Sequence, residues 1–195
     1  IRSFESSAYI DEIIIASLAD KIALIKIICE NVGITKLKKV VEGGKNRLES
    51  AYKGVLNCSE GAELIAIHDA ARPFVSEEII ARTVSAAEKF GAAAPVISVN
   101  DTSRTISKDD CKFSLLDRTS LRLFQTPQVF DAALYKKYLS DAYKNGEMPS
   151  DDCEIFLSRG KYVEPVAGSV FNIKLTTPDE IELAMAIAEM GSAKA

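Results

Sequence analysis

The sequence predicts an α/β fold in which a mainly parallel, twisted β-sheet is covered by helices on both faces. Short apolar runs rich in β-branched residues alternate with segments of helical periodicity, and this order is typical of parallel sheets. The chain has 195 residues, of which 47% are hydrophobic and 27% charged, a composition typical of a globular domain that buries its own core. We therefore expect a single domain over residues 1–195.

The first half of the chain contains three predicted strands, each followed by a predicted helix. Residues 13–16 and 64–67 are apolar, β-branched runs of the kind that form buried parallel strands, and Val40 and Val41 form a shorter one. Helices are expected over residues 20–31, 47–56 and 76–90. The last of these begins at Ser76 with an acidic first turn and ends at Gly91.

The second half continues the alternation less regularly. A further strand is expected over residues 94–99, and helices over residues 131–145 and 151–159. Thr177, Pro178 and Glu180 form a capping box with proline at the first helical position, which predicts a helix that runs to about residue 190. Residues 125–128 predict a turn by their chemistry alone, and residues 172–174 are expected at the end of a short strand.

Residues 101–117 break the pattern of strands and helices. They combine polar side chains with short β-prone pieces and have no helical period. The segment is too long for a simple connection, so it is either an extended hairpin arm or a functional excursion.

Composition and charge exclude several classes of function. A net charge of −4 argues against a nucleic-acid surface, although a few local cations can still bind a phosphorylated small molecule. The apolar run at residues 13–18 is too short to span a membrane, and charged residues interrupt the opening stretch, so we expect no signal peptide. The cysteines lack metal-binding spacing, which predicts no zinc site and reduced thiols in the cytoplasm: Cys29, Cys58, Cys111 and Cys153.

Polar residues directly follow the strongest predicted strand, at the edge of the sheet where α/β folds bind ligands. Asp69 can accept hydroxyl groups, the small side chains of Ala70 and Ala71 allow a ligand to approach closely, and Arg72 can meet a phosphate. The alternative is that Asp69 and Arg72 only pair with each other. We interpret His68, the only histidine, as a structural residue rather than a general base.

Two further segments have the chemistry of anion sites. Gly43 and Gly44 precede a helix whose first turns carry Arg47 and Ser50, and the N–H groups at such a helix start suit an anion or a base edge. This signal is weak alone, because many turns contain two glycines. Lys174 either extends to solvent or reaches an anion in the cleft.

These segments together resemble one protein family. The matching motifs are His-Asp-Ala-Ala-Arg-Pro at residues 68–73, Asp-Thr at 101–102, Asp-Arg at 117–118, Gln-Thr-Pro-Gln at 125–128, Ser-Asp-Asp at 150–152, and Asn-Ile-Lys-x-Thr-Thr-Pro at 172–178. Their order and spacing are similar to those of 2-C-methyl-D-erythritol 4-phosphate cytidylyltransferase, an enzyme of the non-mevalonate isoprenoid route. The resemblance covers nearly the whole chain.

The resemblance implies a Rossmann-like nucleotidyltransferase domain that transfers CMP from CTP to a sugar-alcohol phosphate with release of pyrophosphate and with Mg²⁺. It implies that the nucleotide contacts Gly44, Arg47, Ser50, Asp69 and Ala70. It implies that the acceptor contacts Asp69, Arg72, Thr102, Arg118, Thr126, Ser150 and Lys174. Arg118 and Lys174 would be the catalytic residues, and no residue is assigned to the metal. The 101–117 arm is expected to reach the neighbouring subunit's site in a homodimer.

The sequence also departs from the family pattern. Ser150 stands where threonine is usual, Cys153 where alanine is usual, and Arg104 where lysine is common. The family opens with a strand and a glycine-rich loop for the triphosphate, and no such loop precedes Ile10. We therefore expect the domain to be N-terminally incomplete, and the 195-residue chain alone to have little activity.

Two alternatives to this interpretation remain open. One is a cytidylyltransferase that acts on ribitol 5-phosphate, although Ala70 and Ala71 favour the methylerythritol enzyme, since the ribitol relatives tend to have serine and valine there. The other is a non-catalytic relative that has kept the fold and lost the nucleotide loop.

Overall fold

A computed structural model describes residues 1–107, 109 and 112–192, and its elements alternate much as the sequence predicts. The first half contains β1 (Ile13–Ser17), α2 (Ile22–Asn31), β2 (Leu37–Glu42), α3 (Arg47–Val55), β3 (Leu64–Ile67) and α4 (Glu77–Phe90). The second half contains β4 (Ala92–Ser98), α5 (Ala132–Lys144), α6 (Asp152–Leu157) and α7 (Pro178–Ser192). These elements confirm the predicted ones, with ends that differ by a few residues. The N-terminal α1 (Arg2–Ser6) and the 3₁₀ turn at Ala19–Lys21 are not predicted by the sequence.

The sequence does not predict three short strands of the sheet: β7 (Arg122–Phe124), β8 (Gln128–Asp131) and β9 (Glu164–Ala167). The turn expected over residues 125–128 is the bend between β7 and β8, where the peptide bond before Pro127 is cis. The expected strand end at residues 172–174 was wrong. The strand ends at Ala167, and the chain then turns, because the N–H of Asn172 donates to Ser169 O at 3.1 Å.

The main sheet has the strand order β3-β8-β4-β7, and β9 also pairs with β4. Strand β8 is antiparallel to both β3 and β4, so β3 and β4 run in the same direction but are not neighbours. Strand β9 is parallel to β4, whereas β7 is antiparallel to it. The expected parallel direction therefore holds for β3, β4 and β9. The hydrogen-bonded neighbours are mostly antiparallel, because β7 and β8, which the sequence does not predict, pair alongside these strands.

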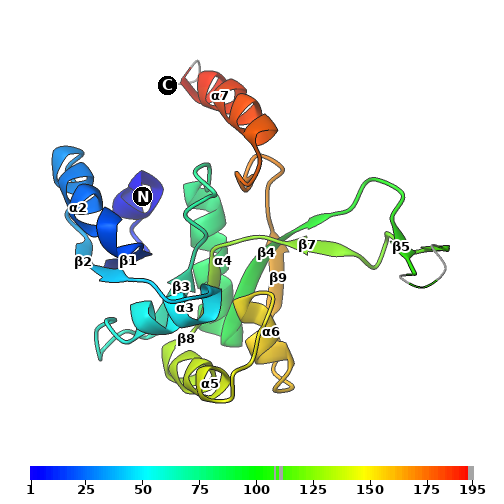
Figure 1. Cartoon of the computed structure of the whole chain (residues 1–195), viewed down its shortest axis with the longest axis horizontal. Coiled ribbons are helices and arrows are strands. Elements are labelled where there is room, and N and C mark those ends of the chain that lie inside the picture. Colours follow the sequence, from blue (N-terminus) through cyan, green and yellow to red (C-terminus); the bar gives the residue numbers. More distant parts are fainter. Residues whose placement is uncertain (108, 110–111, 193–195) are drawn as a thin grey trace.

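Strands β1 and β2 pair in parallel as a separate two-stranded sheet, which lies on the β3 side of the molecule in Figure 1. Helix α2 packs against β2, and α3 packs against β1. These elements bring the loop between β2 and α3 toward the loop that follows β3, and this arrangement positions one side of the site.

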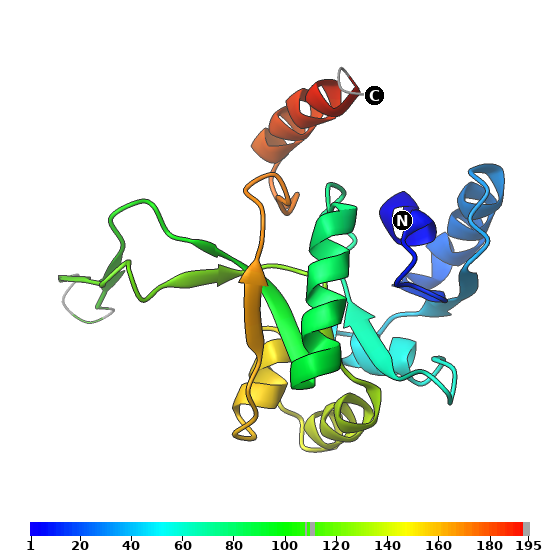
Figure 2. The same cartoon turned by 180° about the vertical axis from the view of Figure 1, so that it is seen from behind.

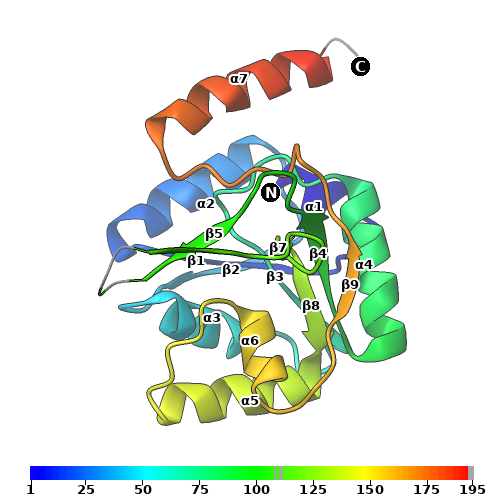
Figure 3. The ribbon, with the colours of Figure 1, turned by 90° about the vertical axis from the view of Figure 1, so that its right-hand side faces the viewer.

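Helices cover both faces of the main sheet, as the sequence predicts. Alternate residues of a strand point to opposite faces: Ala92 and Ala94 of β4 pack with α3, α5 and α6, whereas Ala93 packs with α4. In the same way Phe130 of β8 faces one cluster and Val129 the other. Figure 2 shows α4 lying across the sheet, and Figure 3 shows α5 and α6 on another side of the molecule.

Residues 101–117 contain an antiparallel hairpin of β5 (Arg104–Ile106) and β6 (Phe113–Leu115). The hairpin extends away from the body of the molecule (Figure 1), and the residues of both strands are exposed. Lys108, Asp110 and Cys111, which belong to the expected arm, lie outside the described residues. The role of the arm in dimerisation stays a prediction.

No helix in the described part of the chain combines the length and the apolar character that crossing a lipid bilayer requires.

Candidate functional site

One carboxylate and three cations converge at the loop that follows β3. Lys174 Nζ lies 3.0 Å from Asp69 Oδ2, and Arg72 Nε lies 3.5 Å from the same oxygen. Arg47 Nε lies 3.9 Å from the other oxygen, Asp69 Oδ1. The cations come from three separate segments of the sequence, so the fold builds this group. We call these four residues the Asp69 centre.

The Asp69 centre has the electrostatics of an anion site. Burial alone would raise the pKa of Asp69, but Lys174, Arg47 and Arg72 together lower it below its ordinary value, so the carboxylate is ionised at neutral pH. Three cations therefore face this carboxylate, and the Lys174 side chain is 42% exposed. An incoming phosphate can bind this accessible ammonium group through charge-assisted hydrogen bonds.

The loop that carries Asp69 is held by a partly buried chain of hydrogen bonds. The carbonyl of Arg72 can only accept a hydrogen bond, so the His68 Nε2 that lies 3.0 Å from it carries the ring proton. His68 Nδ1 then accepts from the Thr126 hydroxyl at 3.0 Å, and Thr126 Oγ1 accepts from the Asp69 N–H at 3.1 Å. Burial lowers the pKa of His68 to about 4, so the imidazole is neutral and structural, as the sequence predicts.

The segment that carries Lys174 is tied to the same region by side-chain amides. Gln125 Nε2 donates to Ser169 O at 2.8 Å, and Gln125 Oε1 accepts from the Ser169 N–H at 3.2 Å. Arg72 Nη1 donates to Asn172 O at 2.8 Å. Asn172 and Gln125 are both buried. Both residues lie in polar motifs that resemble the family pattern, but their role as braces of the Lys174 segment is visible only in the structure.

The predicted nucleotide residues of the β2–α3 loop also come together. Asn46 caps α3 by accepting the Glu49 N–H at 2.8 Å. Ser50 Oγ accepts from the Gly44 N–H and donates to Asn46 O, both at 2.9 Å. A Cβ on Gly44 would lie 2.2 Å from the Cβ of Glu49, so this backbone approaches the helix closely and requires glycine. The same helix begins at Arg47 and aims it at Asp69.

Arg47 has a second, fully buried partner that the site prediction missed. Its Nη2 lies 2.5 Å from Asp152 Oδ2, and the Tyr135 hydroxyl donates to Asp152 Oδ1 at 2.5 Å. Gln128 Oε1 accepts the Asp152 N–H at 3.1 Å. The pair of aspartates at residues 151 and 152, at a helix start, was the sequence signal, but pairing with Arg47 depends on long-range packing.

Three other predicted residues have different surroundings. Ala70 is exposed beside Asp69. Thr126 is buried, and its hydroxyl proton is engaged by the histidine described above, so its contact with an acceptor stays a prediction. Ser150 is exposed, and its N–H and hydroxyl both donate to Glu154 Oε2, at 2.6 and 2.7 Å.

Thr102 and Arg118 lie in the segments that flank the arm hairpin and are exposed. Arg118 Nη1 donates to Asn100 O at 2.6 Å, which links the two ends of the arm. Within one chain Arg118 is therefore anchored to the base of the arm. The placement of Thr102 and Arg118 in a neighbouring subunit's site stays a prediction.

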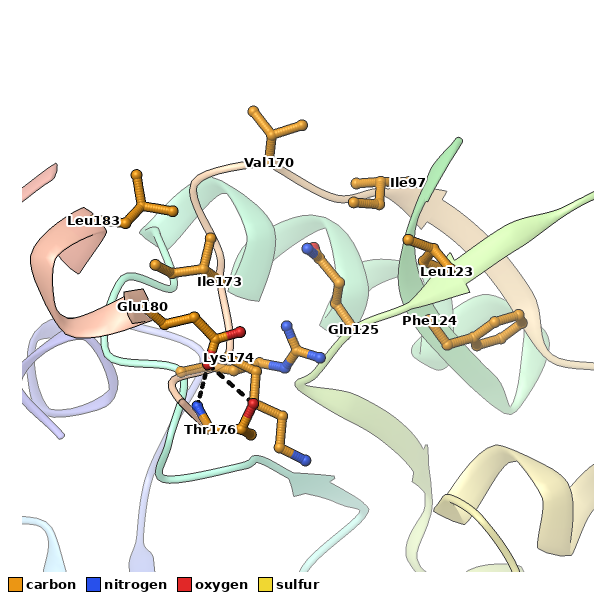
Figure 4. Close-up of a pocket in the computed structure, with 11 residues that line it drawn as sticks. Ile97, Leu123, Phe124, Gln125, Val170, Ile173, Lys174, Thr176, Glu180 and Leu183 are labelled. Carbon is orange, nitrogen blue, oxygen red and sulfur yellow. Dashed lines mark hydrogen bonds between the residues drawn. The ribbon is translucent and has the colours of Figure 1, made fainter. Parts of the chain in front are cut away.

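A pocket of about 290 Å³ opens beside the Asp69 centre (Figure 4). Apart from Arg72 and Lys174, most of its lining is apolar, with Gln125, Thr176 and Glu180 as the polar members. The apolar lining residues are Ile97, Leu123, Phe124, Val170, Ile173 and Leu183. Glu180 accepts hydrogen bonds from the N–H and the hydroxyl of Thr176 (Figure 4). It also accepts from the Thr177 N–H at 2.7 Å, which is the bond that the predicted capping box requires. Cations beside an apolar wall suit a phosphorylated molecule with a carbon skeleton.

The Asp69 centre does not itself form a metal cage. Across residues 1–107, 109 and 112–192 no three histidine, cysteine, aspartate or glutamate side chains cluster in a way that could hold an ion. Asp69 Oδ2 faces Lys174 and Arg72, and Oδ1 faces Arg47. A Mg²⁺ ion prefers several free oxygen ligands, which this carboxylate does not offer.

A mixed α/β sheet with cations gathered at the loop after a central strand is the arrangement of a protein that handles phosphorylated small molecules. The comparison with known families is more specific. Residues 1–190 match the family described as IspD: 2-C-methyl-D-erythritol 4-phosphate cytidylyltransferase. The chain belongs to this family.

Curated relatives carry the same name. The 2-C-methyl-D-erythritol 4-phosphate cytidylyltransferase of Clostridium acetobutylicum is 36% identical over 98% of this chain and 84% of its own length. That of Clostridium botulinum (strain Langeland) is 34% identical over 97% of this chain and 82% of its own length.

Solved structures agree in fold. The 4-diphosphocytidyl-2C-methyl-D-erythritol synthase of Anaerococcus prevotii superposes with a TM-score of 0.89 at 29% identity, covering 96% of this chain and 83% of that one. The 2-C-methyl-D-erythritol 4-phosphate cytidylyltransferase of Thermus thermophilus gives a TM-score of 0.79 at 31% identity, covering 96% and 85%. The Rossmann-like nucleotidyltransferase fold implied by the sequence motifs is therefore confirmed.

Proposed function

We propose that this protein transfers CMP from CTP to 2-C-methyl-D-erythritol 4-phosphate and releases pyrophosphate. The single observation that carries the proposal is the convergence of Arg47, Arg72 and Lys174 on Asp69 beside a pocket with an apolar wall. The names of the relatives supply the substrates. The reaction belongs to isoprenoid precursor synthesis, and we place it in the cytoplasm.

The chemistry is an exchange of phosphate bonds. An oxygen of the acceptor phosphate attacks the α-phosphorus of CTP, the bond from that phosphorus to the bridging oxygen breaks, and pyrophosphate leaves with the electron pair. Two anions must therefore approach each other, so positioning and cationic groups provide most of the rate enhancement.

We assign the nucleotide to the side of the site built by the β2–α3 loop. Gly44 and Ser50 would line the cytosine pocket and Arg47 would support it, with Asp69 and Ala70 near the ribose. The closely packed Gly44 backbone and the capped start of α3 support this assignment, because they hold the loop in one conformation.

We assign the acceptor phosphate to the cations on the other side of Asp69. Arg72 would bind it, and Lys174 would stabilise the charge that develops between the two reacting phosphates. The exposed ammonium group of Lys174 supports this role, because it can exchange its carboxylate partner for a phosphate. Arg118 would stabilise the same charge, with Thr102, Thr126 and Ser150 lining the acceptor pocket.

Mg²⁺ fits this site only as an ion that arrives on the triphosphate, because the oxygens of Asp69 face cations. When bound, it would neutralise charge on the phosphates. A homodimer, in which the arm at residues 101–117 brings Arg118 to the partner's site, is part of the same proposal. The exposed apolar side chains of the arm support it: Ile106, Phe113 and Leu115.

The test is an assay of pyrophosphate release by the full-length protein, with CTP and either 2-C-methyl-D-erythritol 4-phosphate or ribitol 5-phosphate. We expect turnover with the methylerythritol phosphate and a much lower kcat/KM with the ribitol phosphate. A preference for ribitol 5-phosphate would overturn the acceptor assignment. Absence of pyrophosphate release with both, from a protein that is folded by circular dichroism, would show a non-catalytic relative.

A further inference from the structure

A polar cluster penetrates the apolar core behind the nucleotide side of the site. The Tyr135 ring is fully buried and stacks on Phe130, with ring centroids 4.8 Å apart, and near Phe156 at 6.3 Å. Its hydroxyl donates to Oδ1 of Asp152, which is also fully buried, at 2.5 Å. A tyrosine hydroxyl and a carboxylate therefore meet inside a cluster that is otherwise hydrophobic.

This cluster is connected to the Asp69 centre through Arg47. Asp152 uses one oxygen for the Tyr135 hydroxyl and the other for Arg47 Nη2, at 2.5 Å in each case. The Nε of the same guanidinium faces Asp69 at 3.9 Å. Burial alone would lower the pKa of Arg47, but Asp152 and then Asp69 raise it, so the guanidinium is held charged between two carboxylates.

A buried carboxylate such as Asp152 is strongly unfavourable unless both of its oxygens are paired. Each of its oxygens has a different donor, so the carboxylate cannot rotate without leaving one donor unpaired. A guanidinium is planar and binds carboxylates in defined geometries, so a fixed carboxylate fixes the plane of Arg47. The fully buried Tyr135 fixes the carboxylate of Asp152 through its hydroxyl hydrogen bond.

We propose that Tyr135 is a positioning residue of the nucleotide site, which acts through Asp152 to hold Arg47 in place. Tyr135 itself is buried and does not touch the nucleotide. The inference rests on the proposed placement of cytosine beside Gly44, Arg47 and Ser50. It goes further by naming the interior residue that sets the affinity of that pocket. Loss of the hydroxyl should therefore weaken CTP binding more than it slows the chemical step.

The first test compares Tyr135→Phe with Tyr138→Phe in the full-length protein. Both rings pack in the same aromatic cluster and both variants lose one hydroxyl, but only Tyr135 donates to Asp152. We expect Tyr135→Phe to raise the KM for CTP roughly three- to tenfold, with kcat within about twofold. Tyr138→Phe should leave both constants within about twofold. Equal effects of the two variants on KM would overturn the proposal.

The second test asks whether Tyr135 acts through Arg47. If it does, Tyr135→Phe should change the KM for CTP by less than about twofold once Arg47→Ala is already present. If instead the fold-changes in the KM for CTP of the two single variants multiply in the double variant, Tyr135 acts independently of Arg47. The proposal then falls, while the placement of the nucleotide stands. If Arg47→Ala alone leaves the KM for CTP unchanged, the placement of the cytosine pocket is wrong and the proposal falls with it. Thermal unfolding shows whether each variant folds. If one does not, Asp152→Asn, which keeps the shape of the side chain and removes its charge, takes the place of that variant in the comparison.

Discussion

The Asp69 centre and the arm at residues 101–117 differ in how much of their environment one chain supplies. Around Asp69, cations from three segments pair with one carboxylate, and partly buried hydrogen bonds brace the loops that carry them. The arm has two strands of three residues, and all of its strand residues are exposed. The Asp69 centre makes its ion pairs within one chain, whereas the arm exposes apolar side chains of the kind that a second protein surface covers.

Substitutions in these two regions should therefore have different effects. A change in the Asp69 centre removes an interaction that already exists within the chain, so its effect should appear in binding or turnover of each subunit. A change in the arm should alter assembly while leaving the subunit folded.

Lys174→Ala should have the largest effect, because it removes the accessible cation of the Asp69 centre. We expect a loss of roughly ten- to a hundredfold in kcat, as is typical for losing a hydrogen bond to a charged group. The measurement is steady-state pyrophosphate release by the full-length protein. Lys144→Ala, which removes an exposed lysine at the end of α5, is the control. Similar kcat values for the Lys174 variant and the control would contradict the assignment.

His68 should make stability depend on pH. Its pKa is about 4 in the folded protein and 6.5 ordinarily, so between these values the unfolded chain binds the proton more readily. Stability from this residue is therefore full above pH 6.5 and is lost as the pH falls toward 4. The expected loss between pH 7 and pH 5 is about 2 kcal/mol.

Urea unfolding at pH 7, 6 and 5 measures this loss. His68→Asn removes the titrating ring and keeps a polar side chain, so its free energy of unfolding should fall by about 2 kcal/mol less than that of the parent over the same interval. Parallel pH profiles for the two proteins would show that His68 is not buried in its neutral form.

The arm should contribute least to the stability of the subunit. Phe113 and Leu115 are each 68% exposed, so replacing both by serine should change the unfolding free energy of the monomer by about 0.5 kcal/mol or less. Sedimentation velocity at micromolar concentration should show a dimer for the parent and a monomer for the variant. A variant that remains dimeric, or a parent that is monomeric, would contradict the assembly through the arm.

The sequence predicted helices α2 to α7 and the N-terminal strands because their apolar periods and helix caps are local signals. Capping by Glu180 and the stop at Gly91, where φ is +82°, are examples. The strands β7, β8 and β9 have three or four residues each, too few for a period, and they are fixed by pairing with distant strands.

The candidate site was predictable to a similar degree. Asp69, Arg72 and Lys174 were identified because they lie in motifs, and the structure places both cations within 3.5 Å of Asp69 Oδ2. Tyr135 carries no local signal for its role, and the aspartate pair at residues 151 and 152 does not reveal the partners of Asp152. The bonds of Asp152 to Arg47 and to Tyr135 arise only when α3, α5 and α6 pack together. For Arg118 the reverse holds: its motif was clear in the sequence, but the site that we propose for it depends on a second subunit.

The most direct test of the contrast between these regions mixes two variants of the full-length protein that we expect to be strongly impaired. Lys174→Ala and Arg118→Ala chains are each purified, then unfolded together and refolded at equal concentration. If Arg118 acts in the partner's site, a mixed dimer contains one site in which both residues are intact. Half of the dimers are then mixed, so pyrophosphate release should recover to about a quarter of the parent's rate by the statistics of a closed twofold dimer. A mixture no more active than the two variants assayed separately would show that Arg118 does not complete the partner's site, and would contradict this account.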